Sequence, residues 1–187
     1  MNWNLPNILT WMRIVAIPLM VALFYLPHHW SDRFAGLLFA AAAITDSLDG
    51  YFARRMGLTS RLGAFLDPVA DKLIVAVALV LLVSKDPQPV LVLTACVIIG
   101  REIAISALRE WMAELGQRTR VAVSQLGKYK TILQMVGLSM MLFRYPLGGV
   151  DIYRVGLWLT VLAAVLTLWS MVSYLRAAWP VLRAEQD

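Results

Sequence analysis

The sequence predicts an all-α integral membrane protein, a bundle of six transmembrane helices with both termini in the cytoplasm. Apolar residues make up 60% of its 187 positions, whereas roughly 45–50% is usual for a soluble domain. Its mean hydropathy is +0.69. The apolar residues fall in runs close to the ~20 residues that a helix needs to cross a bilayer. One membrane domain over residues 1–187 is therefore expected.

Six spans follow one another along the chain, and turn-forming residues mark most of the connections. The first span is closed by Pro27 and the second by Gly57. The third ends before Pro87, a basic segment follows the fourth, and Pro146 separates the fifth from the sixth. The expected spans are residues 8–26, 34–54, 62–83, 90–108, 126–143 and 152–178.

The lysines and arginines predict which side of the membrane holds the termini. Six spans place both termini on one side, and all but four of the 17 basic residues fall on that side. Cytoplasmic segments of membrane proteins carry the excess of Lys and Arg, so the termini are expected in the cytoplasm. The net charge of +5 is spread over short segments between apolar runs, which argues against nucleic acid as a partner. The single cysteine, Cys96, lies in an apolar run and is expected to be buried.

Acidic residues interrupt the end of the second span. At 100° per residue, Asp46, Asp49, Gly50 and Ala53 share one helix face within an arc of about 100°. The two small residues leave room for a ligand or another backbone to approach the acids.

The third span opens with a matching stripe. Gly63, Asp67 and Asp71 recur every four residues, although Pro68 between the two acids removes one backbone hydrogen bond. The short connection between the second and third spans makes these helices antiparallel neighbours, so their acidic ends are expected to face each other.

Four carboxylates at a membrane boundary need a compensating cation, because burying like charges is costly. Shared protons are one possibility. A divalent metal is another, because oxygen ligands without His or Cys suit Mg²⁺, Mn²⁺ or Ca²⁺. The third is basic side chains, of which the nearest in sequence are Arg54, Arg55, Arg61 and Lys72.

Residues 46–71 read as D-x-x-D-G-x-x-A-R-x8-G-x-x-x-D-x-x-x-D without a departure. This string resembles the signature of the CDP-alcohol phosphotransferase family, membrane enzymes of phospholipid synthesis. The segment 7–13 resembles the N-terminal segment of that family. The segments 100–111 and 126–131 are similar to a bacterial branch, from proteobacteria, whose acceptor is glycerol 3-phosphate.

The resemblance implies transfer of a phosphatidyl group from CDP-diacylglycerol to glycerol 3-phosphate, with release of CMP. It implies that Asp71 is the general base and that two Mg²⁺ or Mn²⁺ ions are held by Asp46, Asp49, Asp67 and Asp71. For Arg54, an ion pair with Asp49 or a lipid headgroup contact is the alternative to nucleotide binding. The residues expected to bind CDP-diacylglycerol are Asn7, Thr10, Arg13, Asp49, Gly50, Ala53, Arg54, Ser60 and Gly63.

The acceptor on this reading is a small dianion, so its site needs fixed positive charge near Asp71. The basic segment 101–130 supplies the candidates. Each of them is also consistent with a cytoplasmic residue held by anionic lipid, a contact worth about 1 kcal/mol near the surface. The expected phosphate-binding residues are Arg101, Arg109, Arg118, Lys128 and Lys130.

The family resemblance further implies a homodimer in the bacterial inner membrane, with membrane lipid around it and the active site facing the cytoplasm. Two alternatives stay open. One is the same chemistry with inositol phosphate, serine or phosphatidylglycerol as acceptor. The other is a cation or proton transporter, although a transport site is expected near the midplane of the membrane, whereas these acids lie at span ends.

Overall fold

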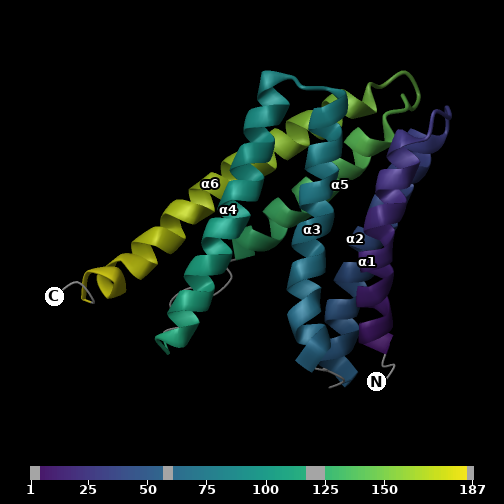
Figure 1. The fold of residues 1–187 in the computed structure, drawn as a ribbon. Helices are drawn as coiled ribbons and strands as arrows, with labels where there is room; N and C mark the ends of the chain where they lie inside the picture. The colour runs from purple at the N-terminus through teal and green to yellow at the C-terminus, as the bar shows by residue number, and fades with distance from the viewer. Residues whose placement is uncertain (1–4, 57–60, 117–124, 185–187) are drawn as a thin grey trace.

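Six helices make up the described part of the chain, and the predicted all-α class is confirmed for these residues. This computed structural model describes the backbone of residues 5–56, 61–116 and 125–184, and the side chains of residues 10–46, 66–116, 129–176 and 179. Within those ranges the one β pairing is an isolated bridge between Leu147 and Val150. The helices, shown in Figure 1, are α1 (Leu5–Tyr25), α2 (Ser31–Met56), α3 (Arg61–Lys85), α4 (Pro89–Glu114), α5 (Gln125–Phe143) and α6 (Ile152–Ala184).

The observed helices match the six predicted spans to within three residues at every end except two. α4 ends at Glu114 rather than at residue 108, and α6 ends at Ala184 rather than at residue 178. The prediction followed apolar residues, but helical backbone hydrogen bonds continue equally well past an apolar run. α4 stops before Gly116, whose φ of 71° and N–H bond to the Ala113 carbonyl at 3.1 Å are typical of a glycine that ends a helix.

Two of the described helical segments are long and apolar enough to cross a membrane, namely Pro89–Glu114 and Ile152–Arg176. Shorter apolar segments run over Thr10–Tyr25 and Tyr129–Phe143. Many large apolar side chains point outward, among them Trp169, which is 73% exposed. Such a surface is typical of a bundle whose outer face meets lipid rather than water. That all six helices cross the membrane stays a prediction.

In the described part of the chain, each helix packs against at least two others. α1 packs on both α2 and α3, α5 packs on α2, α3 and α6, and α4 packs on α3 and α6. The sequence predicts that the acidic ends of α2 and α3 face each other, and Asp46 of α2 does meet Asp71 of α3, with α1 packed against both helices. Large side chains fill the common core, including Met20, Phe39, Leu79, Leu138 and Leu142.

The prediction of a buried Cys96 is wrong, because this cysteine is exposed. α4 buries the face that carries Leu91, Ala95 and Ile98, and the next residue along a helix is rotated by about 100°. An apolar run does not reveal which of its faces packs inward, because lipid-facing positions are apolar as well.

Polar contacts join the helices at the end of the bundle that holds the 26–30, 86–88 and 144–151 connections, uppermost in Figure 1. Lys85 Nζ lies 2.7 Å from Asp32 Oδ1 and joins α3 to α2. The hydroxyl of Tyr153 donates to Asp86 at 2.5 Å. At the opposite end, α1 begins and α6 ends, and α4 and α6 lean away from α1–α3.

Two glycines allow α5 and α6 to approach closely. A Cβ added at Gly156 would lie 2.6 Å from the Gly137 carbonyl oxygen, and one added at Gly137 would lie 2.8 Å from the Gly156 carbonyl oxygen. Because backbone atoms cannot rotate away as side chains do, any larger residue must push the helices apart. Small residues at helix crossings in membranes serve this close approach.

Gly156→Ala is expected to destabilise the protein by at least about 2 kcal/mol, because it overpacks a contact between backbones. The matched control is Gly100→Ala on α4, where an added Cβ meets nothing within 4 Å; this change is expected to be neutral or slightly stabilising. The measurement is the fraction that remains monodisperse in detergent after heating. Equal behaviour of the two variants would contradict the close crossing.

Candidate active site

Three of the four predicted metal-binding acids have described side chains, and two residues of α1 connect them. Arg13 Nη2 lies 3.0 Å from Asp46 Oδ1 on α2, and Arg13 Nη1 lies 2.5 Å from Asp71 Oδ1 on α3. The hydroxyl of Thr10 donates to Asp67 Oδ1. The structure therefore brings Asp46, Asp67 and Asp71 to one place on α1.

The positions along the helices explain this arrangement. Thr10 and Arg13 are three residues apart and share a face of α1, while Asp67 and Asp71 are four residues apart and share a face of α3. The Arg13 side chain is only 3% exposed, whereas the side chains of Asp46 and Asp71 are about one-third exposed, at 34% and 33%. A buried arginine is tolerated where carboxylates pair with it, and here the acids remain reachable from outside.

Arg13 is the basic residue that pairs with these acids in the described side chains, and the sequence did not name it among the candidates for that role. Lys72, which it did name, donates instead to the hydroxyl of Ser106 on α4 at 2.5 Å. Among the described side chains, no group of three potential ligands is close enough to hold one metal ion. The side chain of Asp49 is not among those described. The complete set of four acids therefore stays a prediction.

Several other predicted site residues fall outside the described part of the structure. Ser60 and Arg118 belong to segments that are not described. The rest lie within described helices, but their side chains are not described: Asn7, Asp49, Gly50, Ala53, Arg54, Gly63 and Lys128.

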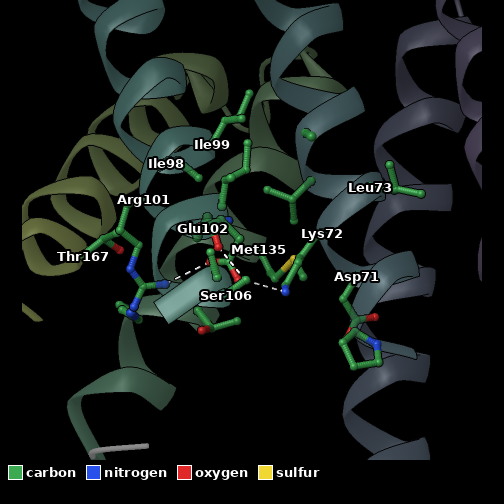
Figure 2. Close-up of a pocket in the computed structure, with 18 of the residues that line it drawn as sticks. Asp71, Lys72, Leu73, Ile98, Ile99, Arg101, Glu102, Ser106, Met135 and Thr167 are labelled. Atoms are coloured by element: carbon green, nitrogen blue, oxygen red, sulfur yellow. Dashed lines mark hydrogen bonds and ion pairs between the residues drawn. The ribbon is translucent and has the colours of Figure 1, made fainter. Parts of the chain in front are cut away.

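A cavity of about 670 Å³ extends from Asp71 into the bundle between α3, α4 and α5. Figure 2 shows Asp71 and Lys72 on one side of it and Arg101 with Thr167 on the other. Isoleucines 98, 99 and 103 of α4 form part of the wall. The remaining polar lining includes Glu102, Ser106, Lys130, Thr131 and Gln134.

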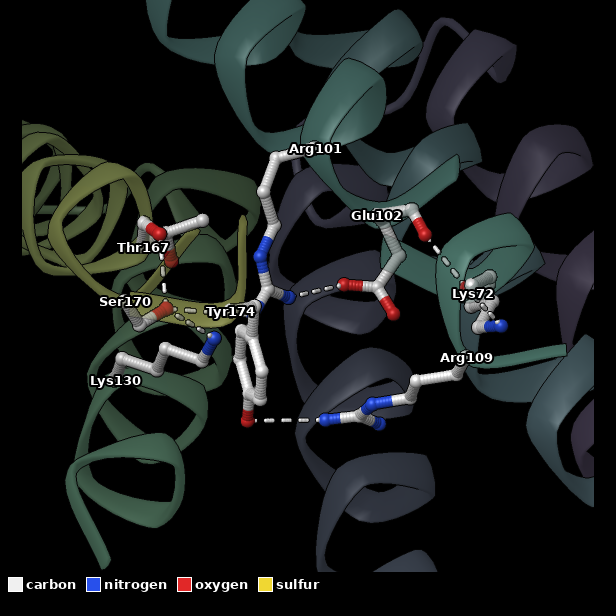
Figure 3. A network of polar contacts seen from close by, with 9 residues as sticks. Lys72, Arg101, Glu102, Arg109, Lys130, Thr167, Ser170 and Tyr174 are labelled. Carbon is white, nitrogen blue, oxygen red and sulfur yellow. Dashed lines mark hydrogen bonds and ion pairs between the residues drawn. The ribbon is translucent and has the colours of Figure 1, made fainter. Parts of the chain in front are cut away.

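Two predicted phosphate-binding residues, Arg101 of α4 and Lys130 of α5, line this cavity together. They are buried, with only 8% and 6% of each residue exposed. Arg101 Nη1 donates to Glu102 Oε2 at 2.9 Å, and Nη2 reaches the hydroxyl of Ser170 on α6 at 3.4 Å. Lys130 Nζ donates to the same hydroxyl at 3.1 Å. Figure 3 shows both cations converging on Ser170.

This pair of cations has the properties of an anion-binding site. Among the described contacts, the two buried cations have one ion-pair partner between them, Glu102, so the pair retains an excess of positive charge. The Nε–H of Arg101 is buried and finds no hydrogen-bond partner among the described residues. An unpaired buried donor is costly, and a phosphate oxygen is a good acceptor for a guanidinium.

Arg109, a third predicted phosphate-binding residue, is placed differently. Its Nη2 donates to the hydroxyl of Tyr174 on α6 at 3.1 Å, and its guanidinium lies 5.2 Å from the centre of that ring. Arg109 is exposed, unlike the buried pair Arg101 and Lys130. Figure 3 shows it below Arg101 and Glu102.

Sequence reasoning missed the contribution of α6 to this site. Thr167, Ser170 and Tyr174 recur at intervals of three and four residues, which places them on one helix face. All three are buried. Their spacing was visible in the sequence, but single hydroxyl residues in an apolar helix often bond only to their own backbone.

The cavity thus connects the Asp71 carboxylate at one end with Arg101 and Lys130, the candidate anion-binding pair, at the other. Such a site can hold an anionic reactant while a carboxylate removes a proton from one of its hydroxyl groups.

Comparison with known proteins agrees with this chemistry. The family model of CDP-alcohol phosphatidyltransferase matches residues 3–169. The CDP-diacylglycerol–glycerol-3-phosphate 3-phosphatidyltransferase of Shigella flexneri serotype 5b (strain 8401) is 52% identical over 178 residues, which cover 95% of this chain and 96% of the relative. The enzymes of the same name from Salmonella choleraesuis (strain SC-B67) and Escherichia coli (strain K12) are 51% identical over the same shares. The chain therefore belongs to the CDP-alcohol phosphatidyltransferase family.

Proposed function

We propose that this protein transfers the phosphatidyl group of CDP-diacylglycerol to glycerol 3-phosphate, giving phosphatidylglycerophosphate and CMP. One observation carries the proposal for this chain, namely that Asp71, Arg101 and Lys130 line the same cavity. The names of the relatives, at 51–52% identity over 95% of the chain, support the same donor and acceptor.

The residues of the cavity divide the reaction between them. Arg101 and Lys130 bind the phosphate of the acceptor, which leaves its primary hydroxyl, at the other end of the glycerol, directed toward Asp71. The Asp71 carboxylate accepts the proton of that hydroxyl as its oxygen bonds to the phosphorus that carries the diacylglycerol. The bond between this phosphorus and the bridging oxygen breaks, and CMP leaves with the electron pair.

The donor chemistry of the acid cluster fits divalent metal. Asp46, Asp49, Asp67 and Asp71 would hold two Mg²⁺ or Mn²⁺ ions, since these metals prefer carboxylate oxygens. When bound, such ions neutralise charge on the pyrophosphate and stabilise the leaving group. The partial exposure of Asp46 and Asp71 leaves them accessible to ions and substrate.

CDP-diacylglycerol binds beside the same acids in this proposal. Thr10 and Arg13 are already at the cluster, and Arg13 presents a planar guanidinium suited to phosphate oxygens as well as to carboxylates. The remaining contacts are those expected for Asn7, Gly50, Ala53, Arg54, Ser60 and Gly63.

The membrane arrangement completes the proposal. All six helices span the bacterial inner membrane as one domain, and the end that carries Asp71 and Arg101 faces the cytoplasm. The excess of Lys and Arg on the side of the termini supports this orientation. The protein works as a homodimer, as its family resemblance implies.

The test is CMP release from CDP-diacylglycerol in detergent micelles with an acceptor panel. With Mg²⁺, glycerol 3-phosphate is expected to support release, whereas inositol phosphate, serine and phosphatidylglycerol are expected to leave it near the acceptor-free rate. A chelator is expected to abolish release. Release with another acceptor of the panel, or undiminished release without metal, would contradict the proposal.

A further inference from the structure

Ser170 of α6 is the meeting point of the two buried cations. Its hydroxyl accepts from Lys130 Nζ at 3.1 Å and from Arg101 Nη2 at 3.4 Å. These partners come from α5 and α4, so one hydroxyl joins three helices at the polar wall of the cavity (Figure 3). Ser170 itself is only 6% exposed, so water offers little competition for these bonds.

The orientation of the hydroxyl is fixed by its own helix. Ser170 donates its single hydrogen to the Thr167 carbonyl at 2.9 Å. A serine hydroxyl has one hydrogen and two lone pairs, so with the hydrogen committed it can only accept from the two cations. Both lone pairs thus face positive charge, and the dipole of the hydroxyl offsets part of the repulsion between Arg101 and Lys130.

We infer that Ser170 is a positioning residue that sets the affinity for the phosphate of the acceptor. This inference rests on the proposed function. Without the hydroxyl, the flexible lysine side chain loses its anchor and the like charges separate, so the acceptor phosphate must pull them together again. That cost falls on acceptor binding, because the acid cluster that serves the lipid nucleotide lies around Asp71, which is at the other end of the cavity.

The experiment compares Ser170→Ala, Ser170→Thr and a control, Ser139→Ala, in the CMP-release assay. Ser139 on α5 donates to the backbone carbonyl of Met135 at 2.7 Å, so the control removes a hydroxyl that bonds within its own helix. Ser170→Ala is expected to raise KM for glycerol 3-phosphate by roughly ten-fold, as for loss of one hydrogen bond to a charged group. Its kcat and its KM for CDP-diacylglycerol are expected to stay within about two-fold of the starting protein.

Ser170→Thr is expected to keep most of the acceptor affinity that Ser170→Ala loses, because threonine retains the hydroxyl. Ser139→Ala is expected to have the same kcat and the same two KM values as the starting protein. Retention of monodisperse protein in detergent confirms that each variant is folded. An unchanged KM in Ser170→Ala, or an equal rise for both substrates, would overturn the inference. Absence of glycerol 3-phosphate-dependent CMP release in the unaltered protein would instead overturn the proposed function, before any variant is compared.

Discussion

Replacement of Asp71 by asparagine is expected to slow CMP release by roughly 10²- to 10⁴-fold, the range that a general base contributes. Asparagine has nearly the same shape and retains an oxygen that can accept from Arg13 Nη1, which lies 2.5 Å from Asp71 Oδ1. The amide cannot take up the proton of the acceptor hydroxyl. Binding of CDP-diacylglycerol is therefore expected to survive while turnover is nearly lost.

Single-turnover CMP release and equilibrium binding of CDP-diacylglycerol, both with Mg²⁺, separate these effects. Asp151→Asn is the matched control, because Asp151 is exposed at the opposite end of the bundle and pairs with Arg154 at 3.2 Å. It is expected to leave both quantities unchanged. Normal turnover in Asp71→Asn would remove this carboxylate from the mechanism.

Arg101→Gln is expected to raise KM for glycerol 3-phosphate on the order of 100-fold, because it removes a buried charge from the anion-binding pair. Arg101 is 8% exposed and its Nε–H has no partner among the described residues, so a phosphate gains contacts there that water does not already provide. KM for CDP-diacylglycerol is expected to change little.

Initial rates over a matrix of both substrate concentrations give the two KM values. Arg154→Gln, which alters a side chain that is 80% exposed, controls for loss of an arginine elsewhere. If Arg101→Gln weakened both substrates equally, Arg101 would belong to the general architecture of the site rather than to acceptor binding.

The helices were predictable because the length of each apolar run indicates a membrane span. The signature over residues 46–71 also predicts the family, which is confirmed. The convergence of Asp46 with Asp67 and Asp71 was predictable from the short connection between the second and third spans and from the four-residue spacing of Asp67 and Asp71. Arg101 and Lys130 were singled out because a charge near a membrane span is costly unless it is used, and both line the cavity.

Contacts between helices were not predictable in the same way. The role of Arg13 as the ion-pair partner of Asp46 and Asp71 depends on α1 packing against both α2 and α3. The role of Ser170 depends on which face of α6 meets α4 and α5. In lipid, inward and outward faces are both apolar, so periodicity does not choose between them, as the exposed Cys96 illustrates.

The mixed wall of the cavity has a consequence for how two unlike reactants meet. Isoleucines 98, 99 and 103 and the charged Arg101, Glu102 and Lys130 line the same space. The acyl chains of a lipid reactant can stay among hydrocarbon chains while a water-soluble reactant arrives from the aqueous phase. Neither reactant has to change solvent in order to react. Under the proposed function, catalysis at this position avoids the cost of extracting a two-tailed lipid from its bilayer.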